Sequence, residues 1–293
     1  MKKDQSFELY GIFGYPLSHT LSPAMHEAAF RKLGIDANYI VLELIPAAFK
    51  KLMRRSSKLS LSGFNVTVPY KETVMQYLDT VRPEARAIGA VNTAYRRGKR
   101  WVGTNTDMEG FLLVLKKDGG FRPFGKRAVI LGAGGAARAV VYGLSKEKAR
   151  EILMADCFPE KARKIASDMG KLFPRVNYEA VLAGTEEVKE SLQKADVIIN
   201  ATPLGLRPRD PRVIPDSWIP KARVKRQFFM DLIYNPAMTP FLKSAKKKGH
   251  KTLNGLGMLL YQGARAWERW TKRKAPVEVM RQALLQALKE QGK

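Results

Sequence analysis

The sequence predicts an α/β fold in two domains, and three observations support this prediction. Short apolar runs alternate with amphipathic helical patterns along most of the chain, as strands and helices do in α/β proteins. A glycine-rich segment at residues 132–137 follows one apolar run and opens a helical pattern. The length of 293 residues exceeds the size at which one core usually stays compact, so two domains are expected.

The first third of the chain is expected to form one α/β unit. Predicted strands cover residues 9–13, 39–44 and 64–68, and predicted helices cover 24–33 and 47–55. Strands at 91–95 and 101–104 flank the turn sequence Arg97-Gly98-Lys99, which indicates a hairpin. A helix over 108–117 follows and ends at Gly119-Gly120.

The region after residue 125 repeats the order of strand and helix that is typical of a parallel sheet. Predicted strands cover residues 127–131, 151–156, 195–200 and 228–232, and two amphipathic helices are predicted at 258–270 and 277–288. The stretch at 119–125, rich in glycine and proline, is interpreted as a linker between the two regions.

Composition excludes several classes of protein. One cysteine, Cys157, excludes an internal disulfide framework, and with only three histidines no metal site is expected. No apolar run approaches the roughly 18 residues that a membrane span needs. The amino-terminal residues lack the apolar block of an export signal, so a cytoplasmic location without membrane contact is expected.

The net charge of +25 raises the question of nucleic-acid binding, because basic proteins often bind nucleic acids. The basic residues are spread over amphipathic helices and turns, without interleaved aromatic residues or a known recognition pattern. We therefore expect a solvated basic surface that helps to attract anionic substrates, and no nucleic-acid partner.

The glycine-rich segment has the pattern G-x-G-x-x-A between a predicted strand and a predicted helix. Gly132 permits the tight turn, Gly134 lets the backbone approach a pyrophosphate, and Ala137 allows helix and strand to pack closely. The free N–H groups of the helix amino terminus then face the phosphates. We predict that a nicotinamide dinucleotide binds here, in contact with Gly132, Ala133, Gly134, Gly135 and Ala136.

Asp156 ends the second strand of this unit, at the place where an acidic side chain contacts the ribose 2′-hydroxyl of NAD. A carboxylate there repels the 2′-phosphate of NADP, and no arginine stands at 157 or 158 to bind that phosphate. NAD is therefore favoured over NADP. The alternative is that Asp156 only caps the helix that begins at Pro159.

Polar residues in the first third indicate a ligand site. Ser22 is the expected N-cap of a helix with Pro23 at its first position. Thr20 and Ser22 could hold a carboxylate at that helix terminus, although capping alone is the alternative. Asn65 and Thr67 are expected on one face of a strand, with Lys71 just beyond its end.

Asn92 and Asp107 stand at the ends of two further strands. Taken singly, each is more often a turn or helix-cap residue.

Taken together, the motifs of this chain resemble those of the shikimate dehydrogenase family. They are GYPLSHTLSP at 14–23, NVTVPYK at 65–71, GAVNT at 89–93, GTNTD at 103–107, the glycine-rich turn at 132, NATPLG at 200–205, DLIYNP at 231–236 and GLGMLLYQGA at 255–264. The resemblance covers nearly the whole chain in the order that the family has.

The resemblance implies a reaction and a set of site residues. The family reaction is the reversible reduction of 3-dehydroshikimate to shikimate, a step in chorismate and aromatic amino-acid biosynthesis. The resemblance implies that Lys71 and Asp107 are the catalytic pair. It also implies that the substrate is held by Thr20, Ser22, Asn65, Thr67, Asn92, Asp107, Tyr234 and Gln262. It also implies cofactor contacts at Thr202, Leu232, Gly255 and Met258.

The expected organisation is a Rossmann-like NAD(P)-binding domain of residues 108–254. A discontinuous α/β substrate-binding domain is expected from residues 1–107 and 255–293. The partners expected are small-molecule substrates, in a monomer or a homodimer.

Two departures from the family pattern bear on specificity. Thr20 replaces the first serine of the family's S-x-S, which keeps the hydroxyl and adds a methyl group, so that shikimate and quinate are less sharply distinguished. Asp156-Cys157-Phe158 replaces the N-R-T triplet that holds the 2′-phosphate of NADP in the family.

Three alternatives remain at this point. A dual quinate and shikimate dehydrogenase that uses NAD is the close one. A non-enzymatic dinucleotide sensor would not need Lys71, Asp107 and Gln262 together, and a nucleic-acid-binding module would need a recognition element.

Overall fold

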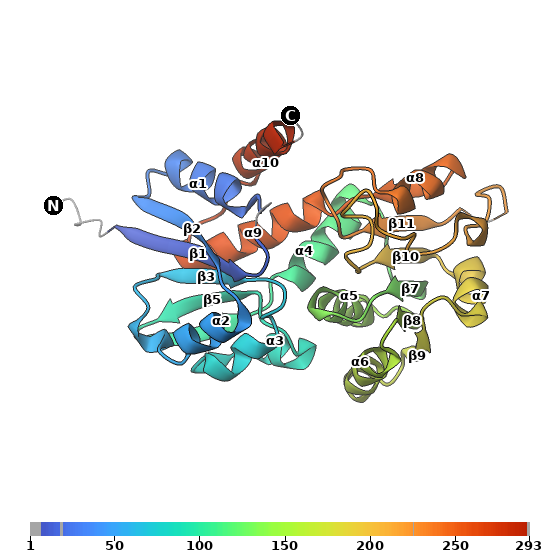
Figure 1. Ribbon diagram of the computed structural model, residues 1–293, viewed down its shortest axis with the longest axis horizontal. Coiled ribbons are helices and arrows are strands. Elements are labelled where there is room, and N and C mark those ends of the chain that lie inside the picture. Colours follow the sequence, from blue (N-terminus) through green and yellow to red (C-terminus); the bar gives the residue numbers. More distant parts are fainter. Residues whose placement is uncertain (1–6, 18–19, 225, 292–293) are drawn as a thin grey trace. The chain divides into compact units, whose positions relative to one another are not determined.

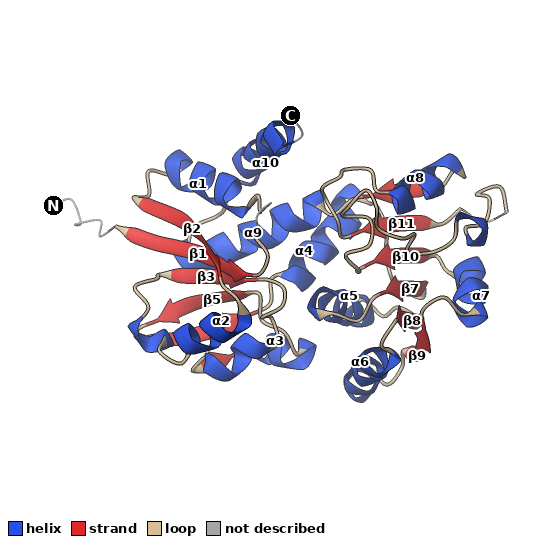
Figure 2. Ribbon diagram, viewed as in Figure 1, coloured by secondary structure: helices blue, strands red, loops and turns tan. Residues whose placement is uncertain are grey.

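The computed structural model describes residues 7–17, 20–224 and 226–291, and the chain divides into two compact units. The first unit is Met1–Gly110 with Leu260–Lys293, and the second is Phe111–Leu259. Both boundaries fall inside helices, namely α4 (Asp107–Leu113) and α9 (Leu256–Thr271). Each unit consists of a sheet with helices (Figure 1, Figure 2). The predicted α/β class is confirmed.

The first unit has a six-stranded mixed sheet in the order β2-β1-β3-β5-β6-β4. Its strands are β1 (Glu8–Gly14), β2 (Ala37–Glu43), β3 (Gly63–Val66), β4 (Thr80–Val81), β5 (Thr93–Arg97) and β6 (Arg100–Thr104). Its other helices are α1 (Ser22–Lys32), α2 (Pro46–Met53), α3 (Pro83–Ile88) and α10 (Val277–Gln291). β5 runs antiparallel to both of its neighbours, β3 and β6, which confirms the predicted hairpin.

Helices cover both faces of this sheet. Phe49 of α2 and Ala85 of α3 join a core with Phe13 and Phe64 of the strands. On the other face, Tyr10 stacks on Phe30 of α1 and on Trp270 of α9. Burial of such large aromatic side chains supplies much of the hydrophobic stabilisation of a domain.

The second unit has a six-stranded sheet that is parallel throughout, in the order β12-β11-β10-β7-β8-β9. Its strands are β7 (Arg127–Leu131), β8 (Glu151–Asp156), β9 (Asn177–Leu182), β10 (Val197–Asn200), β11 (Phe228–Asp231) and β12 (Lys251–Leu253). Its helices are α5 (Gly135–Lys146), α6 (Pro159–Leu172), α7 (Glu186–Lys194) and α8 (Pro240–Lys247). The predicted parallel sheet is confirmed.

Apolar side chains of the strands pack against α7 and α8 in the second unit. Val188 and Leu192 of α7 and Phe241 of α8 belong to one core with strands β7, β8, β10 and β11. Helix α5 lies on the opposite side of the sheet from α7 (Figure 2). No helix within the described residues is long and apolar enough to cross a membrane.

The structure corrects two details of the predicted elements. β3 ends at Val66 rather than at residue 68, because the Thr67 carbonyl accepts a hydrogen bond from the Tyr70 N–H and starts a turn. The α-helix predicted over 108–117 is α-helical only to Leu113 and continues as a π-helical turn at Val114–Asp118.

Candidate functional site

The register of three strands brings the polar residues of the first unit together. Asn65 on β3 lies opposite Thr93 on β5, and Thr93 lies opposite Thr104 on β6. Asn92 immediately precedes β5, and Asp107 follows β6 after two residues. Residues from three separate segments therefore meet at one end of these central strands.

Lys71 and Asp107 form a close ion pair. The Nζ atom of Lys71 lies 2.7 Å from Oδ2 of Asp107, and the two side chains are only 12% and 7% exposed. The Lys71 carbonyl accepts a hydrogen bond from Val91, which ties this segment to the chain before β5. Because little water screens the pair, its electrostatic effect on a bound polar group is stronger than at an open surface.

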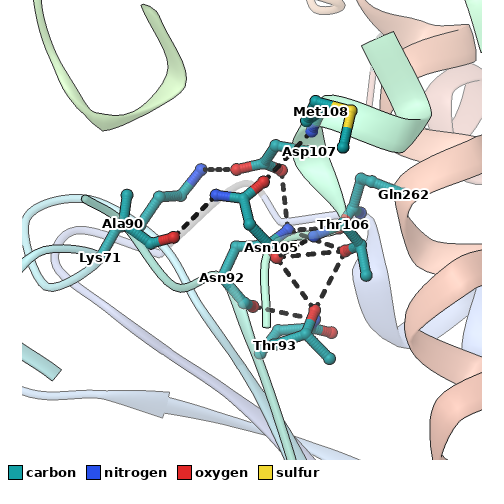
Figure 3. Close-up of polar contacts among 10 residues, drawn as sticks. Lys71, Ala90, Asn92, Thr93, Asn105, Thr106, Asp107, Met108 and Gln262 are labelled. Carbon is teal, nitrogen blue, oxygen red and sulfur yellow. Dashed lines mark hydrogen bonds and ion pairs between the residues drawn. The ribbon is translucent and has the colours of Figure 1, made fainter. Parts of the chain in front are cut away.

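Asp107 is the first residue of α4, where the helix dipole favours a carboxylate. Its other oxygen, Oδ1, accepts a hydrogen bond of 2.8 Å from Nδ2 of Asn92. The side chain of Asn105 caps the helix through the Met108 N–H at 3.1 Å. The Asp107 carboxylate is therefore not needed as a cap and faces Lys71 and Asn92 (Figure 3).

Asn92 is the centre of a buried hydrogen-bond network (Figure 3). Its Nδ2 atom donates to Asp107 and to Oε1 of Gln262, the latter at 3.2 Å. Its Oδ1 atom accepts from the Thr106 N–H at 2.7 Å and from the Thr93 hydroxyl at 3.1 Å. These contacts fix the orientation of the Asn92 amide and, through it, the Asp107 carboxylate.

Thr93 and Thr106 are part of this network, although neither was predicted from the sequence as a site residue. Both are fully buried, and their hydroxyl oxygens lie 3.0 Å apart. The Thr106 hydroxyl also accepts from Nδ2 of Asn92 at 3.0 Å. The signal that could have identified them is their position next to Asn92 and Asp107 in the quoted motifs.

Asn65 points into the same network, as its predicted place on the strand requires. Its Oδ1 atom accepts from the Tyr39 hydroxyl at 2.8 Å, and its Nδ2 atom donates to the Asn92 carbonyl and the Thr93 hydroxyl. Tyr39 was also not predicted from the sequence as a site residue. Burial raises the pKa of the Tyr39 hydroxyl, so that it remains a donor.

The predicted capping role of Ser22 is wrong. Helix α1 begins at Ser22 itself, Leu21 occupies the N-cap position, and no side chain of the described residues forms a cap hydrogen bond there. Ser22 instead lies near the Tyr39 hydroxyl, where it lowers the pKa of that hydroxyl against the larger effect of burial. Thr20 lies beside Ser22, whose N–H donates to the Thr20 hydroxyl at 3.4 Å. Ser18 and His19 of the same motif lie outside the described residues.

Thr67 lies just after β3 and not on it, which corrects the predicted strand position. Its N–H donates to the Phe13 carbonyl. A Cβ atom placed on Gly14 would lie 2.5 Å from the Thr67 methyl group, so the side chain of Thr67 packs against the start of the segment that carries Thr20.

The glycine-rich turn of the second unit has the predicted geometry. Gly132 has φ +107°, a conformation that favours glycine. A Cβ atom on Gly134 would meet nothing within 4 Å, so the backbone there is open to a ligand. Helix α5 begins at Gly135, directly after the turn. These features fit a dinucleotide pyrophosphate held by Gly132, Ala133, Gly134, Gly135 and Ala136.

Asp156 ends β8 beside this turn. Its Oδ2 atom accepts from the Ala133 N–H at 2.7 Å, and its Oδ1 atom accepts from the Phe158 N–H at 2.8 Å. Phe158 is the N-cap residue of α6. The carboxylate therefore contacts both the glycine-rich turn and the start of the next helix.

Three more of the predicted cofactor residues follow the carboxyl ends of strands in the second unit. They are Thr202 after β10, Leu232 after β11 and Gly255 after β12. A Cβ atom on Gly132 would lie 3.0 Å from the Thr202 side chain. A Cβ atom on Gly255 would overlap the Leu232 carbonyl at 2.0 Å, so only glycine permits this close approach. Met258 is buried on α9. Tyr234 also belongs to this unit, and its predicted substrate contact stays a prediction.

Three family models match the chain. The model of the shikimate dehydrogenase substrate binding domain matches residues 12–94. The shikimate / quinate 5-dehydrogenase model matches residues 117–233, and the model of the shikimate 5′-dehydrogenase C-terminal domain matches residues 255–285.

Known proteins are similar to this chain over nearly its full length. A Methanopyrus kandleri protein named shikimate dehydrogenase (NADP(+)) is 41% identical over 290 residues, which is 98% of each chain. The structure of shikimate 5-dehydrogenase from Listeria monocytogenes in complex with shikimate and NAD is 32% identical. It covers 95% of this chain and 96% of that chain, with a TM-score of 0.84. Quinate dehydrogenase from Corynebacterium glutamicum in complex with NAD is 29% identical, with 96% and 99% covered and a TM-score of 0.85.

Proposed function

This chain belongs to the shikimate dehydrogenase family of oxidoreductases, and from that premise we propose that it catalyses the reversible NAD(P)H-dependent reduction of 3-dehydroshikimate to shikimate. The observation that carries the proposal is the ion pair of Lys71 and Asp107 inside a network that includes Asn92 and Gln262. The reaction would serve chorismate and aromatic amino-acid biosynthesis. A cytoplasmic location and a monomeric or homodimeric state stay predictions.

Lys71 is the group that moves the proton. Reduction of a ketone places negative charge on its oxygen, and an ammonium group beside that oxygen stabilises the charge and donates a proton. In the oxidative direction the neutral amine of Lys71 accepts the proton of the substrate hydroxyl. A nicotinamide dinucleotide held by the glycine-rich turn at 132–136 and by Thr202, Leu232, Gly255 and Met258 would supply or accept the hydride.

Asp107 positions Lys71 and contacts the substrate. Its Oδ2 atom holds the ammonium at 2.7 Å, and the Asn92 amide fixes its Oδ1 atom. Gln262, which accepts from Asn92, completes the set that holds the ring hydroxyls. Asn65 and Thr67 extend this set, and Thr20 and Ser22 hold the substrate carboxylate.

For the cofactor we favour NAD over NADP. The Asp156 carboxylate ends β8 beside the glycine-rich turn, and its contact with the Ala133 N–H supports a place next to the bound ribose. A negative charge at that place repels a 2′-phosphate. The Methanopyrus kandleri relative is named as an NADP(+) enzyme, whereas the Listeria monocytogenes structure contains NAD.

A dual quinate and shikimate dehydrogenase is the second candidate. Thr20 carries an additional methyl group where the family has a serine, which changes the shape of the surface around the substrate carboxylate. Likeness to the quinate dehydrogenase of Corynebacterium glutamicum, with a TM-score of 0.85, is the observation that favours this candidate.

One spectrophotometric assay tests both candidates. Purified full-length protein is incubated with shikimate or quinate and with NAD or NADP, and the formation of reduced cofactor is followed by absorbance. Turnover of shikimate with at least tenfold higher kcat/KM than quinate supports the first candidate, and comparable values support the second. No turnover with either acid and either cofactor would contradict the proposed function.

A further inference from the structure

A hollow of about 490 Å³ lies in the second unit, away from the glycine-rich turn. It is lined by Asp216, Lys221, Arg223, Ser244, Lys247 and Lys248. These residues come from the segment before β11, which includes the short helix η4 (Asp216–Trp218), and from the end of α8. The segment precedes the amino end of β11, whereas Gly132 follows the carboxyl end of β7. In a parallel sheet the amino ends and the carboxyl ends of the strands lie on opposite sides. The hollow is therefore separate from the proposed cofactor site.

The charge of the hollow is strongly positive. Its one carboxylate, Asp216, accepts a hydrogen bond from Ser244 at 2.8 Å and forms an ion pair with Arg212 at 3.6 Å. The ammonium group of Lys248 donates to the backbone carbonyls of Asp216 and Ile219, so Lys248 has a structural role. Its charge nevertheless remains in the wall of the hollow.

The other three cations are Lys221, Arg223 and Lys247. All three are exposed, and among the described residues none of them forms an ion pair with a carboxylate. The single carboxylate of the lining, Asp216, is engaged by Ser244 and Arg212, so these three cations repel one another and a bound anion would reduce that repulsion.

The carboxyl end of α8 does not need the side chain of Lys247 for capping. Backbone N–H groups already bind its last carbonyls, because Lys248 donates to Ser244, Gly249 donates to Lys246, and His250 donates to Ala245. The usual role of lysines near a helix carboxyl terminus, which is to bind free carbonyls, therefore does not account for Lys247.

The imidazole of His250 lies beside Lys248, which belongs to the wall of the hollow. It lies between the Gln227 N–H, at 3.2 Å from Nδ1, and the Pro220 carbonyl, at 2.8 Å from Nε2. Burial lowers the pKa of His250, and the charges of Lys248 and Arg226 lower it further, against the opposing effect of the Pro220 hydrogen bond. The surroundings thus disfavour an additional positive charge.

We infer that this hollow binds a small molecule that carries two or more phosphate groups. Arginine and lysine together are suited to phosphate, since the guanidinium group binds two oxygens at once and the ammonium acts as a point charge. The volume lies in the range of about 300–1,000 Å³ that small-molecule sites occupy. A concave site with converging cations favours a compact polyanion over a long duplex, which needs an extended basic surface.

The test is a titration of the full-length protein with pyrophosphate at constant ionic strength, followed by calorimetry and by the NMR signals of the His250 imidazole. The glycine-rich turn could also bind pyrophosphate, but His250 precedes β12 at the amino ends of the strands, close to Lys248 in the wall of the hollow, so its signals should follow binding in the hollow. Its signals are assigned with a His250→Gln variant. We expect a saturable shift of these signals.

Two variants with the same net charge distinguish binding in the hollow from a general effect of the charge of the protein. The first combines Lys221→Ala, Arg223→Ala and Lys247→Ala, and leaves Lys248 in place. The control combines Lys50→Ala, Lys51→Ala and Arg54→Ala, three exposed positions in or beside α2 of the other unit. Loss of three phosphate contacts should weaken the binding that shifts His250 by about tenfold or more, whereas the control should remain within about twofold of the wild type.

Several outcomes would overturn the inference. These are the absence of a saturable His250 shift, equal weakening in both variants, equally tight binding of citrate, and a response to short duplex DNA that exceeds the response to pyrophosphate. Both variants should keep the dehydrogenase activity of the wild type, because the hollow is separate from the proposed active site. The result therefore does not depend on whether the proposed reaction is correct.

Discussion

The ammonium nitrogen of Lys71 lies 2.7 Å from Oδ2 of Asp107, although 36 positions separate the two residues in the sequence. The sheet makes this possible. Lys71 follows β3, Asp107 follows β6, and both strands border β5. The pair depends on tertiary structure and is surrounded by groups that hold it in place.

Asp107→Asn should lower kcat by roughly 10²-fold or more, because the amide keeps the shape of the carboxylate but not the charge that orients an ammonium group. Steady-state kinetics with shikimate measures this effect. Asp36→Asn, an exposed position, is the matched control and should leave kcat unchanged. If Asp107→Asn kept a third or more of the wild-type kcat, Asp107 would not position Lys71.

Thr106→Val should lower both stability and turnover, because valine has the shape of threonine without the hydroxyl that contacts Asn92 and Thr93. Leaving these buried partners unsatisfied costs about 1–3 kcal/mol in the free energy of unfolding. Loss of orientation at Asn92 should also reduce kcat at temperatures where the variant is folded.

The variant Thr106→Ser separates positioning from packing in this experiment. It keeps the hydroxyl and loses the methyl group, so kcat should return close to the wild-type value. A serine variant as slow as the valine variant would show that the methyl group, and not the hydrogen bonds, is what matters. Urea denaturation and kinetics are measured on the same samples.

Replacing Asp156-Cys157-Phe158 with Asn-Arg-Thr should shift cofactor preference towards NADP. The change removes the carboxylate and adds a guanidinium group that can bind a 2′-phosphate, worth about 1.5–3 kcal/mol or roughly 10–150-fold in the ratio of kcat/KM values. Glu160→Gln, which removes one exposed charge in the first turn of α6, is the control. A wild-type protein that already prefers NADP tenfold would refute the role given to Asp156.

His26 should make the stability of the protein depend on pH. This residue of α1 is fully buried, and within the described residues neither ring nitrogen has a hydrogen-bond partner. Burial lowers the pKa of the imidazole from 6.5 to about 3. As the pH falls below 6.5, the unfolded chain takes up a proton that the folded chain does not, so stability is present above that pH and is lost below it.

The loss due to His26 should be about 1.4 kcal/mol per pH unit in the free energy of unfolding, over roughly pH 6 to 4. Urea denaturation of the wild type and of His26→Leu over this range gives the difference. His250 is present in both proteins, so its own contribution cancels. Parallel pH profiles for the two proteins would mean that His26 is protonated in the folded state.

The sequence predicted the second unit best where its strands are buried. β7 and β8 have the predicted bounds of 127–131 and 151–156, because each is a short apolar run at the centre of the sheet. β9 was not predicted. Its sequence Asn-Tyr-Glu-Ala-Val-Leu forms an edge strand that is largely exposed, so the apolar signal of a central strand is missing.

Local patterns could not predict the contacts within the first unit. A capping role was predicted for Ser22 because serine before Pro23 commonly caps a helix, yet Leu21 occupies the N-cap position and Ser22 lies near Tyr39, which is remote in sequence. Thr93 and Thr106 were overlooked since threonine is common in and near strands for packing reasons. Their contact depends on the register of β5 and β6, which no local pattern specifies.

The proposed reaction depends on Lys71, which moves the proton. The most direct test compares wild type and Lys71→Ala by stopped-flow and steady-state kinetics, with shikimate affinity measured separately by calorimetry. We expect kcat to fall by roughly 10²–10⁴-fold while the Kd of shikimate changes little. An alanine variant that turned over shikimate at a rate close to that of the wild type would contradict it.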